Sequence, residues 1–276
     1  MKRWMITGIG SGLGAALAQA ALDRGDVVAG SARDEAVLKS FEAEAPGRAF
    51  GFKLDIRDEA QVIAVVKVVD ERTGGIDVLV NNAGYGLVSA VEEATAAEVR
   101  DQFEVNVFGQ LAVLRAVLPF MRKRRAGHIV NVTSVSGLAT WAGTGIYCAS
   151  KFAFEAIGQT LAQEVAELGI KVTNAAPGGM RTDYAGRSLV LSKNRIADYD
   201  GRARQAEHIL ADHAGKESGD PVRVAAAILK AVDSENPPLH LLLGADALHY
   251  AGDQFEAIQK EIEAWKPVSL STAYPD

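Results

Sequence analysis

The stretch RWMITGIGSGLGAALAQAALDRGDVVAGSA (residues 3–32) contains the pattern that decides the fold. A short apolar run ends at Thr7. Glycines then follow at Gly8, Gly12 and Gly14 and lead into an alanine-rich helical pattern, and a second apolar run closes the stretch. Strands that are apolar on consecutive positions and joined through a helix are typical of a parallel sheet covered on both faces. The stretch therefore predicts a strand–helix–strand unit.

The same alternation continues to the end of the chain. Helical patterns separate five further apolar runs, at residues 49–55, 76–82, 128–134, 170–178 and 239–245. Right-handed crossovers between such strands produce a doubly wound sheet. We therefore predict an α/β fold with a seven-stranded parallel sheet and helices on both faces, a Rossmann-like three-layer sandwich formed by residues 1–276 as a single domain.

Two segments do not follow this alternation. Residues 180–220 are polar and show no strand pattern, and a segment of that length inside a compact domain is more often a functional lid than a connector. We expect it to cover the substrate. Residues 246–276 form a short tail.

Composition excludes several classes of function. The net charge is −6, and the one basic run, MRKRRAG (121–127), fits a solvated helix end, so we expect no nucleic-acid partner. No apolar run approaches the roughly 20 residues that cross a bilayer, and the first strand leaves no room for a signal peptide. The single cysteine, Cys148, fits a reducing cytoplasm. The histidines show no ligand spacing, so we expect no metal site.

The glycine-rich turn TGIGSGLG (7–14) predicts a phosphate-binding site. Glycine permits positive φ and lets a pyrophosphate approach the amide hydrogens, and the helix N-terminus adds donors and partial positive charge. The spacing is one residue looser than the usual G-x-G-x-x-G. Without its context, the turn is also compatible with an ordinary strand-to-helix connection.

The end of the second strand indicates which dinucleotide binds. An acidic residue that reads the ribose diol usually lies about 20 residues after the glycines, but here the sequence has Ala32 followed by Arg33. A guanidinium can bind a 2′-phosphate with two hydrogen bonds. Asp34 is better explained as the N-cap of the next helix. We therefore expect NADP(H), with NAD(H) as the alternative.

The stretch GIYCASKFA (145–153) places Tyr147 one helical turn before Lys151. Side chains at i and i+4 share a helix face, and a nearby ammonium favours the phenolate. This pair suits proton transfer near neutral pH, although a surface pair has the same spacing. Cys148 has no histidine nearby in sequence and is better explained as a small buried side chain.

Two further motifs end strands at the edge where ligands bind in such sheets. These are NNAG (81–84) and VNVTSVSG (130–137). Ser134 precedes Tyr147 by 13 residues, and the intervening loop can return its hydroxyl towards the phenol; Ser136 is the alternative. A hydroxyl and an acidified phenol that converge suit a carbonyl oxygen.

Together, T-G-x3-G-x-G, N-N-A-G, a serine 13 residues before Y-x3-K, and a following P-G resemble the single-domain short-chain dehydrogenase/reductases. The resemblance spans residues 3–245, and IYCASKFAFEAI (146–157) is especially similar to the hydroxysteroid and retinol dehydrogenase branch. It implies a nicotinamide-dependent exchange of hydride with a secondary alcohol or ketone.

The resemblance also implies a role for individual residues. Tyr147 would be the acid/base, Lys151 would bind the nicotinamide ribose and lower the tyrosine pKa, and Ser134 would polarise the substrate oxygen. Asn106 would kink its helix and complete a proton relay through water. Asp55 would contact the adenine amine and Asn82 would flank the adenosine ribose. The implied cofactor-binding residues are Thr7, Gly8, Gly12, Leu13, Gly14, Arg33, Asp55, Asn82, Ala83, Gly84, Tyr147, Lys151, Pro177, Gly178 and Thr182.

The predicted partners are an apolar alcohol or carbonyl substrate and further copies of the chain. The substrate cleft is expected to be lined by Leu138, Trp141, Tyr147, Met180 and Tyr184. A homodimer or homotetramer is expected through the helices near 101–124 and 147–168, although the side chains concerned could equally belong to the core; they are Leu111, Leu114, Phe154 and Leu161. Two other functions stay open, a catalytically silent NADP(H)-sensing protein and an extended sugar-nucleotide epimerase or dehydratase, although the glycine spacing and the short tail argue against the second.

Overall fold

The structure, a computed structural model, describes residues 1–182 and 188–274 and contains the predicted seven-stranded sheet. All neighbouring strands of this sheet pair in parallel. In spatial order, the strands are β3 (Ala49–Lys53), β2 (Val27–Ala32), β1 (Arg3–Thr7), β4 (Val78–Asn81), β6 (Gly127–Val132), β7 (Ile170–Pro177) and β9 (His240–Leu243). The strand order turns back between β1 and β4, which places the crevice for a ligand beside the glycine-rich turn.

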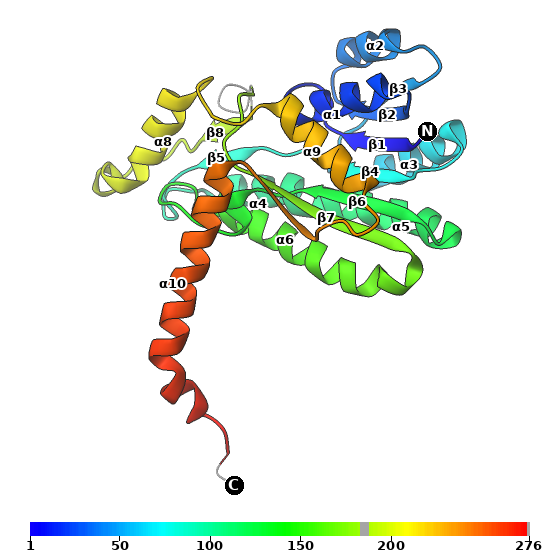
Figure 1. The fold of residues 1–276 in the computed structure, drawn as a ribbon. Helices are drawn as coiled ribbons and strands as arrows, with labels where there is room; N and C mark the ends of the chain where they lie inside the picture. The colour runs from blue at the N-terminus through cyan, green and yellow to red at the C-terminus, as the bar shows by residue number, and fades with distance from the viewer. Residues whose placement is uncertain (183–187, 275–276) are drawn as a thin grey trace.

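Helices cover both faces of the sheet, as predicted (Figure 1). One face carries α1 (Gly12–Asp23), α2 (Glu35–Glu44) and α9 (Pro221–Asp233), whose apolar side chains form one core cluster with the strands. The other face carries α3 (Glu59–Thr73), α5 (Gln110–Arg124) and α6 (Gly145–Val165), which form the second cluster. Asp34 caps α2 as expected, because its carboxylate accepts from the Ala36 amide at 2.8 Å.

The helix predicted near 101–124 starts earlier and is interrupted. It comprises α4 (Ala96–Phe103), a π-helical segment over Glu104–Gly109, and α5. By length and composition this helix could cross a membrane, contrary to the expectation from the sequence, but core helices of soluble proteins pass the same test. Its apolar side chains Val113, Val117 and Met121 are buried against the sheet.

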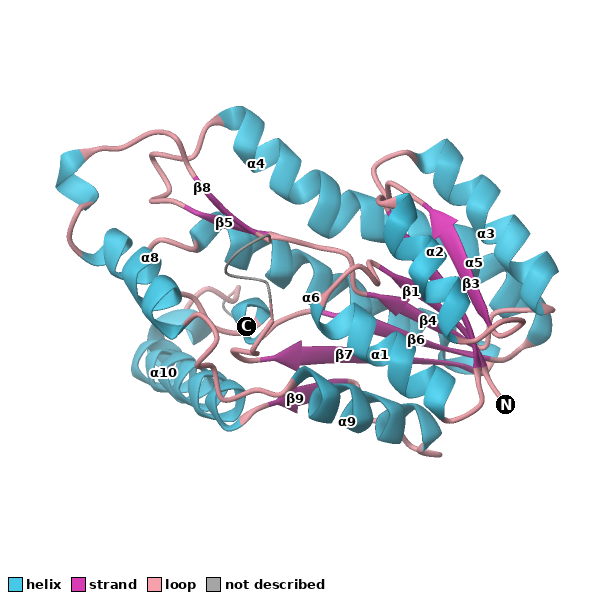
Figure 2. Ribbon diagram, turned by 90° about the horizontal axis from the view of Figure 1, so that it is seen from above, coloured by secondary structure: helices cyan, strands magenta, loops and turns pink. Residues whose placement is uncertain are grey.

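Residues 180–220 contain a strand, which the sequence pattern did not predict. The three-residue β8 (Leu189–Leu191) pairs in parallel with β5 (Gly86–Val88) beyond the carboxyl edge of the main sheet (Figure 2). A 3₁₀ turn over Ala197–Tyr199 and the helix α8 (Arg202–His213) follow. The strand escaped prediction because it is short and two of its three residues are exposed. We call residues 189–213 the cap.

The C-terminal tail is mainly helical. The helix α10 (Ala245–Leu270) has 26 residues, contacts β9 and the 3₁₀ turn Val135–Gly137 near its start, and then leaves the body of the protein, so that the chain ends away from the sheet (Figure 1).

Candidate active site

The glycine-rich turn between β1 and α1 forms an open cradle. Gly8 and Gly12 have φ of 74° and 57°, which side-chain-bearing residues rarely adopt. A Cβ atom at Gly14 would lie 2.2 Å from the carbonyl oxygen of Gly8, so the helix start is packed directly on the turn. A Cβ at Gly10 would meet nothing within 4 Å. The turn is therefore closed towards the protein and open towards a ligand, and it fits a pyrophosphate.

Thr7 and Asn82 hold this turn against the end of β4. The Thr7 hydroxyl accepts from the amides of Asn82 and Ala83 at 2.9 and 3.1 Å. The side-chain amide of Asn82 donates to the carbonyl oxygens of Thr7 and Gly8 at 2.9 and 3.0 Å. Both side chains therefore position the cradle, a role that the sequence motif did not specify.

The adenosine end carries two guanidinium groups beside a carboxylate. Arg33 follows β2 and is exposed. The Arg57 side chain, which sequence reasoning missed, binds both oxygens of Asp55, with Nε at 2.9 and 3.1 Å. The Arg57 guanidinium holds the pKa of Asp55 below its usual range, with a smaller contribution from Arg33. The predicted residues Arg33 and Asp55 are therefore near one another, at the ends of adjacent strands.

Asn106 lies in the π-helical segment, which confirms the predicted distortion of its helix. Its amide nitrogen donates to the Tyr85 carbonyl oxygen at 2.9 Å and to the Ser150 hydroxyl at 3.1 Å, and its oxygen accepts from the Tyr85 amide at 3.1 Å. A Cβ at Gly84 would lie 3.1 Å from the Asn106 oxygen and 3.8 Å from Lys151 Nζ. The N-N-A-G motif, Asn106 and Lys151 therefore meet at one place.

Tyr147 and Lys151 lie on the same face of α6. Lys151 Nζ is 5.9 Å from the centre of the Tyr147 ring, and the ring is half-buried. Lys151 itself is buried and donates to the Val132 carbonyl oxygen at 3.0 Å. Burial lowers the pKa of Lys151 to about 8, and the charge of Glu155 opposes this shift. The ammonium is thus tied to the end of β6 while it faces the phenol.

Ser134 follows β6 two residues after Val132, the acceptor for Lys151. Its hydroxyl accepts from the Ser136 amide at 3.1 Å and starts the 3₁₀ turn Val135–Gly137. That turn packs on α6, since a Cβ at Gly137 would lie 2.9 Å from the Lys151 carbonyl oxygen. The predicted serine is therefore attached to the helix that carries the tyrosine. Cys148 is buried, consistent with a packing role.

The P-G motif at the end of β7 rests on a carboxylate that sequence reasoning did not identify. The Gly179 amide donates to Asp246 Oδ2 at 2.7 Å, and a Cβ at Gly178 would lie 2.2 Å from that oxygen. Thr182 lies beside Gly12, since a Cβ at Gly12 would be 3.4 Å from the Thr182 side chain. The segment after the P-G motif therefore approaches the glycine-rich turn.

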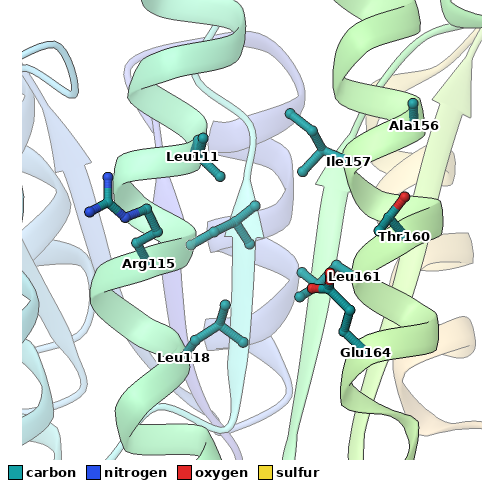
Figure 3. Close-up of a pocket in the computed structure, with 9 residues that line it drawn as sticks. Leu111, Arg115, Leu118, Ala156, Ile157, Thr160, Leu161 and Glu164 are labelled. Atoms are coloured by element: carbon teal, nitrogen blue, oxygen red, sulfur yellow. The ribbon is translucent and has the colours of Figure 1, made fainter.

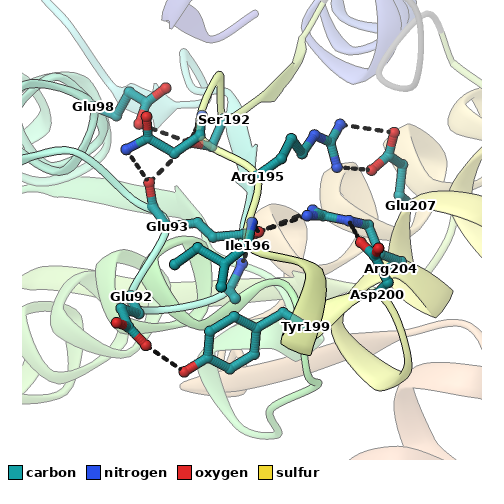
Figure 4. Close-up of polar contacts among 12 residues, drawn as sticks. Glu92, Glu93, Glu98, Ser192, Arg195, Ile196, Tyr199, Asp200, Arg204 and Glu207 are labelled. Carbon is teal, nitrogen blue, oxygen red and sulfur yellow. Dashed lines mark hydrogen bonds and ion pairs between the residues drawn. The ribbon is translucent and has the colours of Figure 1, made fainter.

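A buried ion pair fastens the cap to the segment after β5 (Figure 4). Glu93 is fully buried and binds Arg204 of α8 through both oxygens, at 2.5 and 3.1 Å. The amides of Ile196 and Ala90 also donate to it, at 2.7 and 3.1 Å. The Arg204 guanidinium and these amides lower the pKa of Glu93 to about 2, although desolvation opposes the shift.

Peripheral contacts extend this attachment. The Ser192 hydroxyl donates to Glu98 at 3.0 Å, and the Tyr199 hydroxyl donates to Glu92 at 2.6 Å. Within the cap, Arg195 pairs with Glu207 at 2.7 Å. The partners of Glu93 and Glu98 lie about a hundred residues away in the chain, so no local sequence signal identified them.

The predicted substrate cleft differs in part from the structure. Trp141 packs edge-on against Tyr250 of α10, with ring centres 5.3 Å apart, and Leu138 packs with Ala251. Met180 contacts the core cluster that contains α1, and Tyr184 lies outside the described residues. Leu138 and Trp141 thus contact α10, which the sequence pattern did not place near them.

Known proteins resemble this chain over nearly its whole length. A family model for short chain dehydrogenases matches residues 2–189. Oxidoreductase BOA17 of Botryotinia fuckeliana is 38% identical over 99% of both chains, and human retinol dehydrogenase 8 is 34% identical over 85% of this chain and 79% of its own.

Solved structures show the same relationship. A short-chain dehydrogenase from Streptomyces avermitilis has a TM-score of 0.93 and 39% identity and covers 99% of this chain and 100% of its own. A short-chain dehydrogenase/reductase from Burkholderia phymatum in complex with NAD has a TM-score of 0.82, 26% identity and coverage of 94% and 95%. ElxO with NADP bound has a TM-score of 0.74 and 25% identity, and the match covers 90% of this chain and 99% of its own. The chain belongs to the short-chain dehydrogenase/reductase family and is an oxidoreductase.

Proposed function

We propose that the protein is an NADP(H)-dependent oxidoreductase that interconverts a secondary alcohol and a ketone, with Tyr147 as general acid/base. The observation that carries the proposal is the convergence of Tyr147, buried Lys151 and Asn106 beside the Gly84 backbone. Ser134 is fastened to the same helix through the turn that follows it.

The residues present fit a nicotinamide dinucleotide. In the turn at Gly8–Gly12, the amides of Gly8 and Ile9 donate to the Ser31 carbonyl oxygen, which fixes the turn beside the N-terminus of α1. The space beside Gly10 and the first amides of α1 suit the pyrophosphate. Relatives of known structure hold NAD or NADP, so family membership alone does not select between them. Arg33 supplies an exposed guanidinium at the adenosine end, which favours the dinucleotide with the 2′-phosphate, whereas the charge of Arg57 is paired with Asp55.

The proposed chemistry assigns one task to each side chain. The nicotinamide, when bound, supplies or accepts the hydride. Ser134 donates a hydrogen bond to the substrate oxygen, and Tyr147 transfers its phenolic proton to that oxygen during reduction or accepts it during oxidation. Lys151, held by the Val132 carbonyl, stabilises the phenolate through its charge. Asn106, in the distorted part of its helix, makes room beside Lys151 for a water molecule, and this water links Lys151 to solvent so that the proton can be replaced. General acid–base catalysis of this kind contributes about 10²–10⁴-fold.

The substrate is proposed to be bulky and apolar and to lie between the catalytic face of α6 and the cap. The similarity to retinol dehydrogenase 8 supports this class of substrate. The attachment of the cap through Glu93 and Arg204 supports a preformed cover over the site rather than a freely moving lid.

Replacing Tyr147 by phenylalanine tests the proposal. We expect Tyr147→Phe to lower kcat with a panel of apolar ketones and NADPH by about 10²–10⁴-fold, because the proton donor is lost. NADPH binding, followed by fluorescence, should persist. Wild-type protein that binds NADPH but reduces no ketone in the panel would instead support the sensing function.

We also propose that the protein forms a homo-oligomer through the groove between α5 and α6 (Figure 3). The groove, of about 450 Å³, is lined by apolar side chains that include Leu111, Leu118 and Ile157, and Arg115 and Glu164 lie on its opposite sides. A two-fold axis would bring these opposite charges together between copies. Phe154 and Leu114, which were predicted for this surface, are buried in the core, with exposed fractions of 0% and 1%.

A further inference from the structure

The C-terminal helix carries an apolar stripe with a seven-residue repeat. Apolar side chains occur along α10 at alternating spacings of three and four residues, the spacing of the a and d positions in a coiled coil. Three repeats are present in the sequence, and the two that follow Ala251 are exposed. The stripe consists of Leu248, Ala251, Phe255, Ile258, Ile262 and Trp265.

Only the first turns of this helix pack against the body of the protein. Ala247 and Ala251 are fully buried there. Beyond them the stripe is open: Phe255 is 53% exposed, Ile262 59% and Trp265 65%. The helix leaves the body along this segment and nothing from the described chain covers it (Figure 1). Large apolar side chains that gather on one exposed face indicate an interaction surface.

The charges of the helix argue against a lipid surface as the partner. Helices that lie on membranes are rich in lysine and arginine. The sequence of α10 has five acidic residues and two lysines, so its charge opposes an anionic bilayer. A protein partner with a matching apolar stripe is favoured.

The polar residues beside the stripe are complementary to those of a second copy. In a parallel pair, each residue at the position before a faces the residue five places later in the other helix. This rule pairs Glu261 with Lys266 of the second helix, and it pairs Gln254 with Gln259. Each pairing occurs twice by symmetry. The Glu261–Lys266 pair is attractive, and the Gln254–Gln259 pair is neutral.

We propose that α10 pairs in parallel with α10 of a second copy of the chain, through the part of the stripe beyond Ala251, which comprises Phe255, Ile258, Ile262 and Trp265. This interface is separate from the groove between α5 and α6, so it can join two copies whether or not the groove is also occupied. It lies outside the catalytic residues, and the proposed reaction does not depend on it.

Sedimentation velocity of the full chain tests the proposal. We expect Ile262→Glu to halve the mass, with a rise in the dimer Kd of at least about 100-fold, because it buries a carboxylate in an apolar seam. Ala264→Glu is the matched control, since it places the same charge in the same turn on the opposite side, and it should keep the wild-type mass. Both side chains are exposed in the single chain, and circular dichroism should confirm an unchanged fold.

A charge exchange tests the parallel orientation. Glu261→Lys should weaken the dimer about tenfold, and the double variant Glu261→Lys/Lys266→Glu should restore it. The variant Leu118→Glu, in the groove between α5 and α6, tells the two interfaces apart. It should leave the association of copies through α10 unchanged, so that adding Ile262→Glu to it still halves the mass. An equal mass for wild type and Ile262→Glu, or no restoration in the double variant, would overturn the proposal. So would Ile262-dependent flotation with phosphatidylcholine/phosphatidylglycerol vesicles without a change in mass.

Discussion

The glycine turn at residues 7–14 and the cap at residues 189–213 lie beyond the same edge of the sheet, but different contacts hold them. The turn is fixed by backbone atoms and by two short side chains, Thr7 and Asn82. The cap is fixed by a buried ion pair between Glu93 and Arg204, which are 111 residues apart. The contacts of the turn also join distant residues, 74 to 76 positions apart, but those residues lie in two recognisable motifs, T-G and N-N-A-G. Glu93 and Arg204 belong to no such motif. The difference predicts separate consequences for mutations in the two regions.

The largest effect in this comparison is expected at Gly14. Gly14→Ala places a methyl group 2.2 Å from the Gly8 carbonyl oxygen and 2.5 Å from the Asn82 amide nitrogen, so the turn must shift. We expect NADPH affinity, measured by fluorescence titration, to fall about 100-fold, the upper end of overpacking costs. Gly10→Ala is the matched control, because its methyl group meets nothing within 4 Å, and it should bind NADPH within about threefold of wild type. Equal losses in both variants would show that packing does not define the cradle.

Arg33 extends the comparison to an exposed residue next to the turn. Arg33→Ala removes a proposed charge-assisted contact to the 2′-phosphate, so the ratio of kcat/KM for NADPH over NADH should fall roughly 10- to 30-fold. NADH activity should change little, because the dinucleotide without the phosphate makes no such contact. Arg57→Ala is the companion variant, because it removes a guanidinium that is already paired with Asp55. An unchanged ratio in Arg33→Ala would contradict the NADP(H) preference.

The fold could be predicted because its signals are local. Seven apolar runs predicted the strands of the main sheet. The i, i+4 spacing predicted that Lys151 faces the Tyr147 ring, while the approach of the Ser134 hydroxyl to the phenol stays a prediction. The distortion at Asn106, which the family resemblance implies, occurs as a π-helical segment.

Other features depend on contacts that no local pattern encodes. The strand β8 exists only through its pairing with β5. Arg204 in isolation resembles an ordinary surface arginine, and it becomes a half-buried anchor only because the buried Glu93 faces it. Asp246 likewise looks like a first-turn acidic residue until the P-G motif is seen to rest on it.

The cap anchor should affect substrate binding more than cofactor binding. Glu93→Gln removes the carboxylate that binds Arg204 across to the segment after β5 and leaves Arg204 paired, among the described residues, only with Asp200 of the cap itself. The cap should therefore loosen, and KM for a bulky ketone should rise about 3- to 10-fold, while NADPH affinity stays near wild type. Glu207→Gln is the control, because its pair with Arg195 is more exposed. A loss of NADPH affinity as large as that of Gly14→Ala would show that the cap and the turn act as one unit.

The smallest effect is the acid dependence of the same anchor. The folded pKa of Glu93 is about 2, below the ordinary value of 4.5, chiefly because of its hydrogen bond with Arg204. A carboxyl whose pKa is lowered on folding stabilises the protein fully above its unfolded pKa and loses that contribution as pH falls through the folded value. The thermal midpoint of wild type should therefore exceed that of Glu93→Gln at pH 7. The difference should shrink between pH 4.5 and pH 2, since wild type gradually acquires a neutral side chain like that of the variant. A difference that stays constant over this range would show that shape, and not the charge of Glu93, holds the cap.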